Sequence, residues 1–385
     1  MSIHRFSFPT PIHFGPGVRS KLADFLKGEG HKRPLIVTDK GLAALPLHKE
    51  ISGLLAGSGL KVATFSGIWG NPVKSQVTEG VRAFRAHDAD CIVGLGGGAA
   101  LDVAKAIALM ATHPGDLFDY EDEKPGARPI DGEIPFWVAV PTTSGTGSEV
   151  GRSSVVSDDQ THIKKIIFSP KLLARAVFAD PELTLDLPAG VTAATGMDAL
   201  THCVEAYLAK GYHPICDGVA LEGLSQAARF LARAVRSPKD IEARGGMMMS
   251  SMMGAIAFQK GLGVTHSCAH ALGTVADMHH GLANGVMIDH ALKHNLAAVP
   301  ERFHTMALRI ELKDSSPEGF IRWLGELKRE TGIPARLAGV TPPVGPIGKD
   351  KLDRLVEIAT ADACHPNNPT PCVREDFVRI FAEAF

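Results

Sequence analysis

Residues 91–109 read CIVGLGGGAALDVAKAIAL, an apolar run followed by three consecutive glycines and then by a helix-like segment. Glycines lack a Cβ, so the turn at 96–98 lets the backbone approach a ligand closely. A helix that starts near Ala100 points its free N–H groups and the positive end of its dipole at the same place, which favours phosphate. The stretch therefore predicts a strand, a phosphate-binding turn and a helix, although a tight turn without a ligand fits the same letters.

Units of the same kind surround this stretch and indicate the fold class. Apolar runs bounded by Gly, Pro or Asp occupy 34–39, 61–67, 91–98 and 136–143. Amphipathic segments lie between them, for example 18–28 and 77–90. Continuously apolar strands that alternate with helices predict a parallel sheet covered on both faces, hence a Rossmann-like α/β domain. The Pro-interrupted segment 6–15 is expected to form an extended edge piece.

The sequence changes character near Leu183–Pro188. From Ala189 onward, strand-like runs nearly vanish and long Ala-, Leu- and Met-rich helix patterns replace them. A chain of 385 residues also exceeds the usual size of a single hydrophobic core. We therefore predict an α/β dinucleotide-binding domain over residues 1–185 and an all-helical domain over residues 186–385. The methionine cluster at 247–253 is expected to fill the core of the helical domain.

Composition excludes several classes of partner. The chain is 45% hydrophobic and 21% charged, with a net charge of −2, so it lacks the basic surface that nucleic acid requires. No apolar run approaches the roughly 18 residues needed to span a bilayer. The N-terminal residues lack the pattern of a signal peptide, and the six cysteines form no CxxC pair. These features predict a cytoplasmic protein whose partner is a small molecule.

Two further stretches favour a nucleotide. Asp39 ends the run LIVTD, where a carboxylate can accept hydrogen bonds from a ribose diol and repel a 2′-phosphate. An ordinary turn or N-cap aspartate is the alternative. The loop PTTSGTGSE (141–149) places hydroxyls and glycines directly after a strand-like run, although a solvated loop has the same composition. Together with the glycine turn, these stretches predict a dinucleotide site.

The segment 266–290 contains five histidines in apolar, Gly/Ala-rich sequence. Buried imidazoles need partners, so these rings either form hydrogen bonds in the core or bind a metal. His266 and His270 are four residues apart and share one helical face, and His280 follows after an expected helix break at Gly273.

A second pair with the same spacing lies upstream. Asp198 and His202 are also four residues apart, in a helix for which Thr195 is a plausible N-cap. Such a pair is more often a surface feature than a ligand pair. Combined with the histidines of 266–290, it forms a set of nitrogen and oxygen donors that suits Fe(II), Zn(II), Co(II) or Ni(II).

Several motifs occur in one order along the chain and resemble the iron-containing (group III) alcohol dehydrogenases. They are GGGAALDVAK (96–105), PTTSGTGSE (141–149), DPELTLDLP (180–188), ATGMDALTHCVEAY (194–207) and the segment 266–281. The family fold is similar to that of dehydroquinate synthase and glycerol dehydrogenase. The resemblance implies a Rossmann-like N-terminal domain, an all-helical C-terminal domain and an active site in the cleft between them.

The resemblance also implies roles for individual residues. The metal ligands of the family match Asp198, His202, His266 and His280. His280 is preferred over His279 because the last ligand of the family immediately precedes a glycine, here Gly281. His270 matches a further histidine near the nicotinamide, to which we assign either proton relay or contact with the nicotinamide. The positions that match cofactor contacts are Asp39, Asn71, Gly97, Gly98, Thr142, Thr143 and Lys164, the last adjoined by Lys165.

Three positions depart from the family pattern. Ala99 replaces a common serine, which removes one hydroxyl from the glycine turn and with it a hydrogen bond of about 0.5–1.5 kcal/mol. Gly70 stands where proline is common, and His279 replaces a frequent proline and is a possible competing ligand.

The expected function is that of a metal-dependent, NAD(P)-linked alcohol dehydrogenase or aldehyde reductase. The expected cofactors are Fe(II), with Zn, Ni or Co possible, and NAD, with NADP possible. A homodimer is what the resemblance suggests. The alternatives are a maleylacetate reductase, a glycerol dehydrogenase-like relative, a lyase similar to dehydroquinate synthase, or a metal-binding scaffold without catalysis.

Overall fold

The computed structural model describes residues 8, 10–122 and 124–385. Within this range the chain forms two compact units. The α/β unit consists of Phe8–Thr143 and Ser148–Thr184. The helical unit consists of Ser144–Gly147 and Leu185–Phe385. The chain therefore enters the helical unit briefly after residue 143, returns to the α/β unit, and leaves it for good after residue 184.

A six-stranded parallel sheet forms the centre of the α/β unit, in the order β1-β8-β5-β4-β2-β3. Its strands are β1 (Ile12–Phe14), β2 (Pro34–Asp39), β3 (Ala63–Ile68), β4 (Cys91–Gly96), β5 (Phe136–Pro141) and β8 (Val177–Ala179). The four strands predicted from apolar runs are thereby confirmed as β2 to β5. The edge piece predicted at 6–15 is a strand only over Ile12–Phe14, and its residues 6, 7 and 9 lie outside the described residues.

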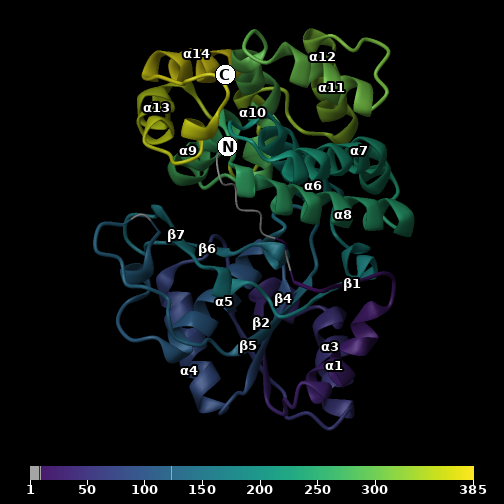
Figure 1. The fold of residues 1–385 in the computed structure, drawn as a ribbon, viewed down its shortest axis with the longest axis vertical. Coiled ribbons are helices and arrows are strands. Elements are labelled where there is room, and N and C mark those ends of the chain that lie inside the picture. The colour runs from purple at the N-terminus through teal and green to yellow at the C-terminus, as the bar shows by residue number, and fades with distance from the viewer. Residues whose placement is uncertain (1–7, 9, 123) are drawn as a thin grey trace. The chain divides into compact units, whose positions relative to one another are not determined.

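Helices cover both faces of this sheet (Figure 1). On one side lie α1 (Leu22–Gly28) and α3 (Pro46–Gly57), and on the other lie α4 (Lys74–Ala86) and α5 (Gly98–Thr112). The central strands β2, β4 and β5 are almost wholly buried because apolar helix faces pack on them from both sides. A small antiparallel pair, β6 (Ser153–Ser157) with β7 (Lys164–Phe168), completes the unit. Polar and charged residues interrupt both of these strands, so the apolar-run criterion did not predict them.

The helical unit is built around α6 (Ala189–Leu208), whose residues from Thr192 to Leu208 are all buried. The other α-helices are α7 (Pro214–Arg236), α8 (Ile241–Ala257), α9 (Val264–Ala276), α10 (His280–Leu292), α11 (Pro300–Arg309), α12 (Pro317–Thr331), α13 (Leu352–Thr360) and α14 (Arg374–Ala384). From residue 185 to the end of the described chain there is no strand, as predicted. Met247, Met248 and Met252 are buried, in agreement with a core role.

Two predicted helix boundaries are wrong. Thr195 is not an N-cap, because α6 begins at Ala189 and the Thr195 hydroxyl donates to the Val191 carbonyl one turn earlier, at 2.9 Å. Gly273 does not end α9, which continues to Ala276 and stops where Asp277 adopts a left-handed backbone with φ of 47°. Burial of Gly273 inside the helix explains why its low propensity is overridden.

The excursion Ser144–Gly147 packs tightly within the helical unit. A Cβ on Gly145 would lie 2.8 Å from the side chain of Thr195, and one on Gly147 would lie 2.2 Å from Ala255. Real Cβ atoms do not approach this closely, so glycine is required at both positions for the loop to lie against α6 and α8.

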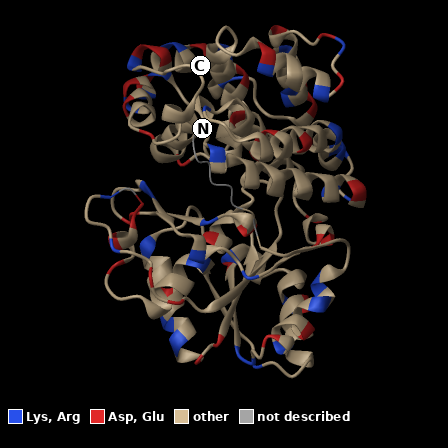
Figure 2. Cartoon of the chain, viewed as in Figure 1, with Lys and Arg blue, Asp and Glu red and all other residues tan. Residues whose placement is uncertain are grey.

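Charged residues of both signs are interspersed over both units, in agreement with the net charge of −2 (Figure 2). None of the described helices has both the length and the apolar character needed to cross a membrane.

The burial of α6 predicts a stability effect. Leu200 is 0% exposed, so Leu200→Ala should lower the free energy of unfolding of the helical unit by about 2–5 kcal/mol. The matched control is Leu308→Ala on α11, where the side chain is 56% exposed and the change should stay within about 0.5 kcal/mol. Chemical denaturation followed by circular dichroism measures both, and equal effects would contradict the packing described.

Candidate metal centre and nucleotide site

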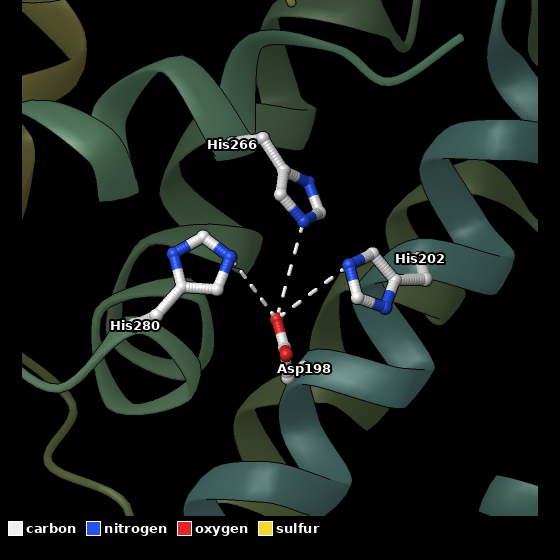
Figure 3. A group of neighbouring side chains, drawn as sticks. All are labelled: Asp198, His202, His266 and His280. Carbon is white, nitrogen blue, oxygen red and sulfur yellow. Dashed lines mark ion pairs between the residues drawn. The ribbon is translucent and has the colours of Figure 1, made fainter. Parts of the chain in front are cut away.

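Four side chains from three helices meet inside the helical unit (Figure 3). Asp198 and His202 lie on α6, His266 on α9 and His280 at the start of α10. Their potential ligand atoms all lie within 4.8 Å of one another. The Asp198 Oδ1 atom is 3.8, 4.0 and 3.5 Å from the Nε2 atoms of the three histidines, in the order 202, 266 and 280.

The cluster is largely shielded from solvent. Asp198, His202 and His266 are at most 4% exposed, while His280 retains 23% side-chain exposure on one side of the cluster. Burial lowers the pKa of His202 to about 4, so this imidazole is neutral at pH 7. Neutral imidazole is the form that binds a metal.

A glycine lets α10 approach α6 at this point. A Cβ on Gly281 would lie only 2.3 Å from the carbonyl oxygen of Ala194. Any other residue after His280 would push the two helices apart. The glycine that guided the choice of His280 over His279 therefore has a packing reason.

Glu205 is a buried carboxylate beneath His266 that the sequence prediction missed. Its Oε2 atom accepts a hydrogen bond from His266 Nδ1 at 2.7 Å. The backbone N–H groups of Gly263, Thr265 and His266 donate to the same carboxylate at 2.9, 2.6 and 3.2 Å. Burial alone would raise the pKa of Glu205, but these bonds lower it below the usual value. Because Nδ1 carries the proton, the lone pair of His266 is on Nε2, facing Asp198.

Asn284 is a second residue of the centre that was not predicted. It lies one helical turn after His280 and is 0% exposed. Its Nδ2 atom donates to Asp198 Oδ1 at 2.7 Å, and lies 3.3 and 3.2 Å from Nε2 of His266 and His280. The amide therefore holds the carboxylate oxygen among the imidazole nitrogens.

The donor set fits a divalent transition metal. One carboxylate oxygen and three imidazole nitrogens converge, and at His266 the carboxylate behind the ring fixes the tautomer that a metal ligand needs. Three histidines and one aspartate suit Fe(II) or Zn(II), and cysteine is not among the converging groups.

The other two histidines near this cluster lie apart from it. His279 is exposed and caps the N-terminus of α10, with its Nδ1 atom 3.4 Å from the Leu282 N–H. It is not part of the converging group. His270 stacks on His280 with ring centroids 5.3 Å apart, and its Nδ1 atom hydrogen-bonds Asp362. His270 thus lies beside the four converging residues without being one of them.

In the α/β unit five of the seven predicted cofactor residues gather at the carboxyl ends of β2, β4 and β5: Asp39, Gly97, Gly98, Thr142 and Thr143. In the sheet, β3 lies on one side of β2 and β4 lies on the other, so successive strands are added in opposite directions from this point. Open α/β sheets bind ligands at such a switch point. Asp39 caps the short helix α2 (Lys40–Ala43) through Leu42 N–H at 2.8 Å, so the N-cap interpretation holds for Oδ1. Its Oδ2 lies 3.6 Å from where a Cβ on Gly96 would be.

The glycine turn and the threonines after β5 are neighbours. Gly97 is the N-cap of α5 and Gly98 is its first residue. Thr142 N–H donates to the Gly96 carbonyl at 3.0 Å, and a Cβ on Gly97 would lie 3.2 Å from the side chain of Thr143. Gly96 has φ of 150°, which favours glycine. The N-terminus of the fifteen-residue helix α5 is therefore open to close approach by an anion.

Asn71 and Lys164 lie at the edge of the same unit. Lys164 pairs with Ser157 across β6 and β7, and the Ser157 N–H donates to the carbonyl of Pro72, next to Asn71, at 2.7 Å. Lys165, the alternative to Lys164, forms an ion pair with Glu121 at 2.8 Å. Gly70 has φ of 61°, a conformation that proline cannot adopt, which accounts for the absence of proline there.

Known protein families match both the N-terminal and the C-terminal part of the chain. The protein-family model for iron-containing alcohol dehydrogenase matches residues 9–181. A second family model, for the C-terminal part of the Fe-containing alcohol dehydrogenase family, matches residues 192–385. The chain is 37% identical to the 4-hydroxybutyrate dehydrogenase of Cupriavidus necator, over 97% of this chain and 98% of that protein.

Solved structures give the same result. A crystal structure of 1,3-propanediol oxidoreductase superposes with a TM-score of 0.93 at 34% identity, covering 99% of this chain and all of that one. The sulfoacetaldehyde reductase of Bifidobacterium kashiwanohense, solved with NAD+, gives a TM-score of 0.88 at 26% identity, covering all of this chain and 99% of that one.

These findings define an oxidoreductase that acts on CH–OH donors. The chain belongs to the iron-containing alcohol dehydrogenase family, as its motifs predicted. Iron and NAD are the cofactors of that family, which agrees with the expected pair and with the donor set of the helical unit.

The contacts of Glu205 predict its effect on metal affinity. In Glu205→Gln the NH2 group would face a buried N–H donor in either orientation, that of Thr265 at the Oε1 position or those of Gly263 and His266 at the Oε2 position. The contacts that hold the start of α9 and orient the His266 ring would therefore be weakened. We expect a 10- to 100-fold loss of Fe(II) or Zn(II) affinity, roughly the usual effect of removing such a partner. Competition with a chelating dye measures it. Glu326→Gln, at a side chain 60% exposed, is the control, and equal affinities in both variants would show that Glu205 does not support the site.

Proposed function

We propose that this chain is an alcohol dehydrogenase or aldehyde reductase in which Asp198, His202, His266 and His280 bind a divalent metal and residues of the α/β unit bind NAD. The observation that carries the proposal is the convergence of three Nε2 atoms on one carboxylate oxygen. When bound, the cation supplies Lewis-acid polarisation of the substrate oxygen, and the nicotinamide exchanges hydride with the substrate carbon.

The side chains of the centre divide the remaining tasks. Asp198 and the three histidines orient the cation, with Glu205 and Asn284 behind them. In alcohol oxidation the substrate loses a hydride from carbon and a proton from oxygen. His270 takes that proton, because it lies beside His280 and its side chain is 24% exposed.

The cofactor residues are assigned to parts of a dinucleotide. The backbone of Gly97 and Gly98 at the start of α5, with Thr142 and Thr143, receives the pyrophosphate. Asp39 receives the ribose diol through Oδ2 and disfavours a 2′-phosphate. Asn71 and Lys164 make further contacts. NAD is therefore the expected cofactor, with NADP accepted less well.

The segments 1–185 and 186–385 act in this proposal as the dinucleotide-binding and catalytic domains. The substrate is a small alcohol or the corresponding aldehyde. The named relatives that act on 4-hydroxybutyrate and 1,3-propanediol support a short, polar substrate. We further propose a cytoplasmic homodimer, as the resemblance to the family suggests. The negative net charge and the mixed surface charge support a small-molecule partner over nucleic acid.

Removal of one proposed ligand tests the metal centre. His266→Ala should abolish stoichiometric metal binding and lower kcat/KM for a short alcohol by about 10³-fold or more, since Lewis-acid stabilisation is worth several kcal/mol. Metal content is measured by inductively coupled plasma mass spectrometry, with a panel of alcohols as substrates. The control is His304→Ala at an exposed position. Retention of both metal and turnover in His266→Ala would show that the ligand assignment is wrong.

Substitution of Asp39 tests the cofactor preference. Asp39→Gly removes the carboxylate and should shift the ratio of kcat/KM for NAD over NADP toward NADP by about 10- to 100-fold, the value of a lost charge-assisted hydrogen bond. Because Asp39 also caps α2, Asp39→Ser is the matched variant: serine restores the cap without the charge. Both variants should shift the ratio alike. An unchanged ratio in both would exclude the ribose contact.

A further inference from the structure

His270 has a carboxylate partner supplied by a distant part of the chain. Asp362 follows α13 and lies 92 positions after His270 in the sequence. Its Oδ2 atom is 2.7 Å from His270 Nδ1, and both side chains are partly buried, at 14% and 24% exposure. A bond of this length between an imidazole N–H and a carboxylate is charge-assisted and orients the ring.

The carboxylate is itself held in place from its other side. Its Oδ1 atom accepts a hydrogen bond from the Ser267 hydroxyl at 2.7 Å and from the Cys364 backbone N–H at 2.9 Å. The Ser267 oxygen in turn accepts from the His365 N–H at 3.0 Å. The two oxygens of Asp362 are therefore distinct: one is fixed by the protein, and the other is directed at His270.

A second metal site is the competing interpretation of these residues, because ligand atoms of His270, Asp362 and Cys364 lie within 4.8 Å of one another. Two observations oppose it. Burial raises the pKa of the Cys364 thiol well above its ordinary value, so the thiolate form that binds metals is disfavoured. The His270 nitrogen and the Asp362 oxygen are also already joined by a short hydrogen bond.

Asp362 remains ionised. Burial alone would raise its pKa, but His270 and the hydrogen bonds from His270, Cys364 and Ser267 together hold the pKa of this carboxyl well below its usual range. An ionised carboxylate accepts hydrogen bonds and cannot donate them, so in neutral His270 the proton is on Nδ1 and the lone pair is on Nε2.

We propose that Asp362 is a positioning residue for the proton-transfer step: it fixes His270 in the Nδ1–H tautomer, so that the lone pair of Nε2 is available to accept the substrate hydroxyl proton. This inference rests on the proposed function of His270. The step balances, since the substrate O–H bond breaks, the Nε2–H bond forms, and the hydride passes to the nicotinamide. In aldehyde reduction the same atoms return the proton.

Asp362→Asn reverses this arrangement without changing side-chain shape. The backbone N–H of Cys364 cannot rotate away, so the asparagine oxygen must face it and the NH2 group must face His270. His270 Nδ1 then becomes an acceptor and its proton moves to Nε2, the wrong atom for accepting a proton. We expect kcat to fall by about 10²-fold or more, as for loss of general acid–base catalysis, with KM changed little.

The experiment has two readouts on zinc-loaded enzyme. Nitrogen-15 NMR of histidine-labelled protein, with the His270 signals identified by their loss in His270→Gln, reports the tautomer directly. We expect Nδ1–H in the unaltered chain and Nε2–H in Asp362→Asn. Steady-state kinetics should show that His270→Gln and the double variant His270→Gln/Asp362→Asn lose similar activity, because His270 and Asp362 act as one unit. Asp353→Asn on α13, at a side chain 97% exposed, is the control and should match the unaltered enzyme in both readouts.

Three outcomes would overturn the inference. An unchanged tautomer in Asp362→Asn would show that the carboxylate does not set the ring. A changed tautomer with unchanged kcat would show that the setting does not matter for turnover. A second zinc per chain, lost in Asp362→Asn, would show that the group binds metal. Failure of the proposed function is distinguishable, because it would leave the unaltered enzyme without turnover whatever the NMR result.

Discussion

The arrangement of the candidate metal ligands in the helical unit depends on the buried carboxylate of Glu205, which holds both the start of α9 and the ring of His266. Ionised groups are costly to bury, and here four N–H donors from the first turn of α9 offset that cost. The same contacts anchor the start of α9 to α6 and fix the tautomer of His266. The Glu205 carboxylate thus caps the start of α9 and orients the candidate metal ligand His266 at the same time. A change at Glu205 therefore disturbs the backbone and the metal centre together, which is why a conservative amide at this position is not a neutral substitution.

The two units prepare their sites by different means. In the α/β unit the candidate cofactor contacts come mainly from backbone at strand ends and at the start of α5, where glycines remove side chains. In the helical unit the chemistry comes from side chains that project inward from buried helices, and Asp198, His266 and His270 each have a second polar group behind them. The backbone contacts of the α/β unit suit a dinucleotide, a ligand common to many enzymes. The side chains of the helical unit instead fix the positions of individual charges and protons.

Much of this could be predicted from the sequence. Apolar runs and glycine turns predicted the strands of the parallel sheet because burial on both faces leaves a local signature. The four converging residues followed from a family resemblance whose motifs are local. Glu205, Asn284 and Asp362 could not be found in this way, since each has a partner far away in the sequence: His266 is 61 positions from Glu205, Asp198 is 86 from Asn284, and His270 is 92 from Asp362. The available signal was a charged or amide side chain inside an apolar helix, as Glu205 is in HCVEAY. Thr195 and Gly273 misled because tertiary burial overrides local capping and breaking preferences.

The excursion Ser144–Gly147 makes the helical unit discontinuous in sequence. Within the described residues, three peptide connections, after residues 143, 147 and 184, join the two units, where a simple two-domain chain would have one. A fragment beginning at Leu185 would lack the loop that covers Thr195 and Ala255, and would expose surface that is buried in the intact chain. The boundary visible in the sequence is therefore not a point at which the protein can be divided. The helical unit is complete only when residues 144–147, which lie between the two segments of the α/β unit in the sequence, belong to the same polypeptide.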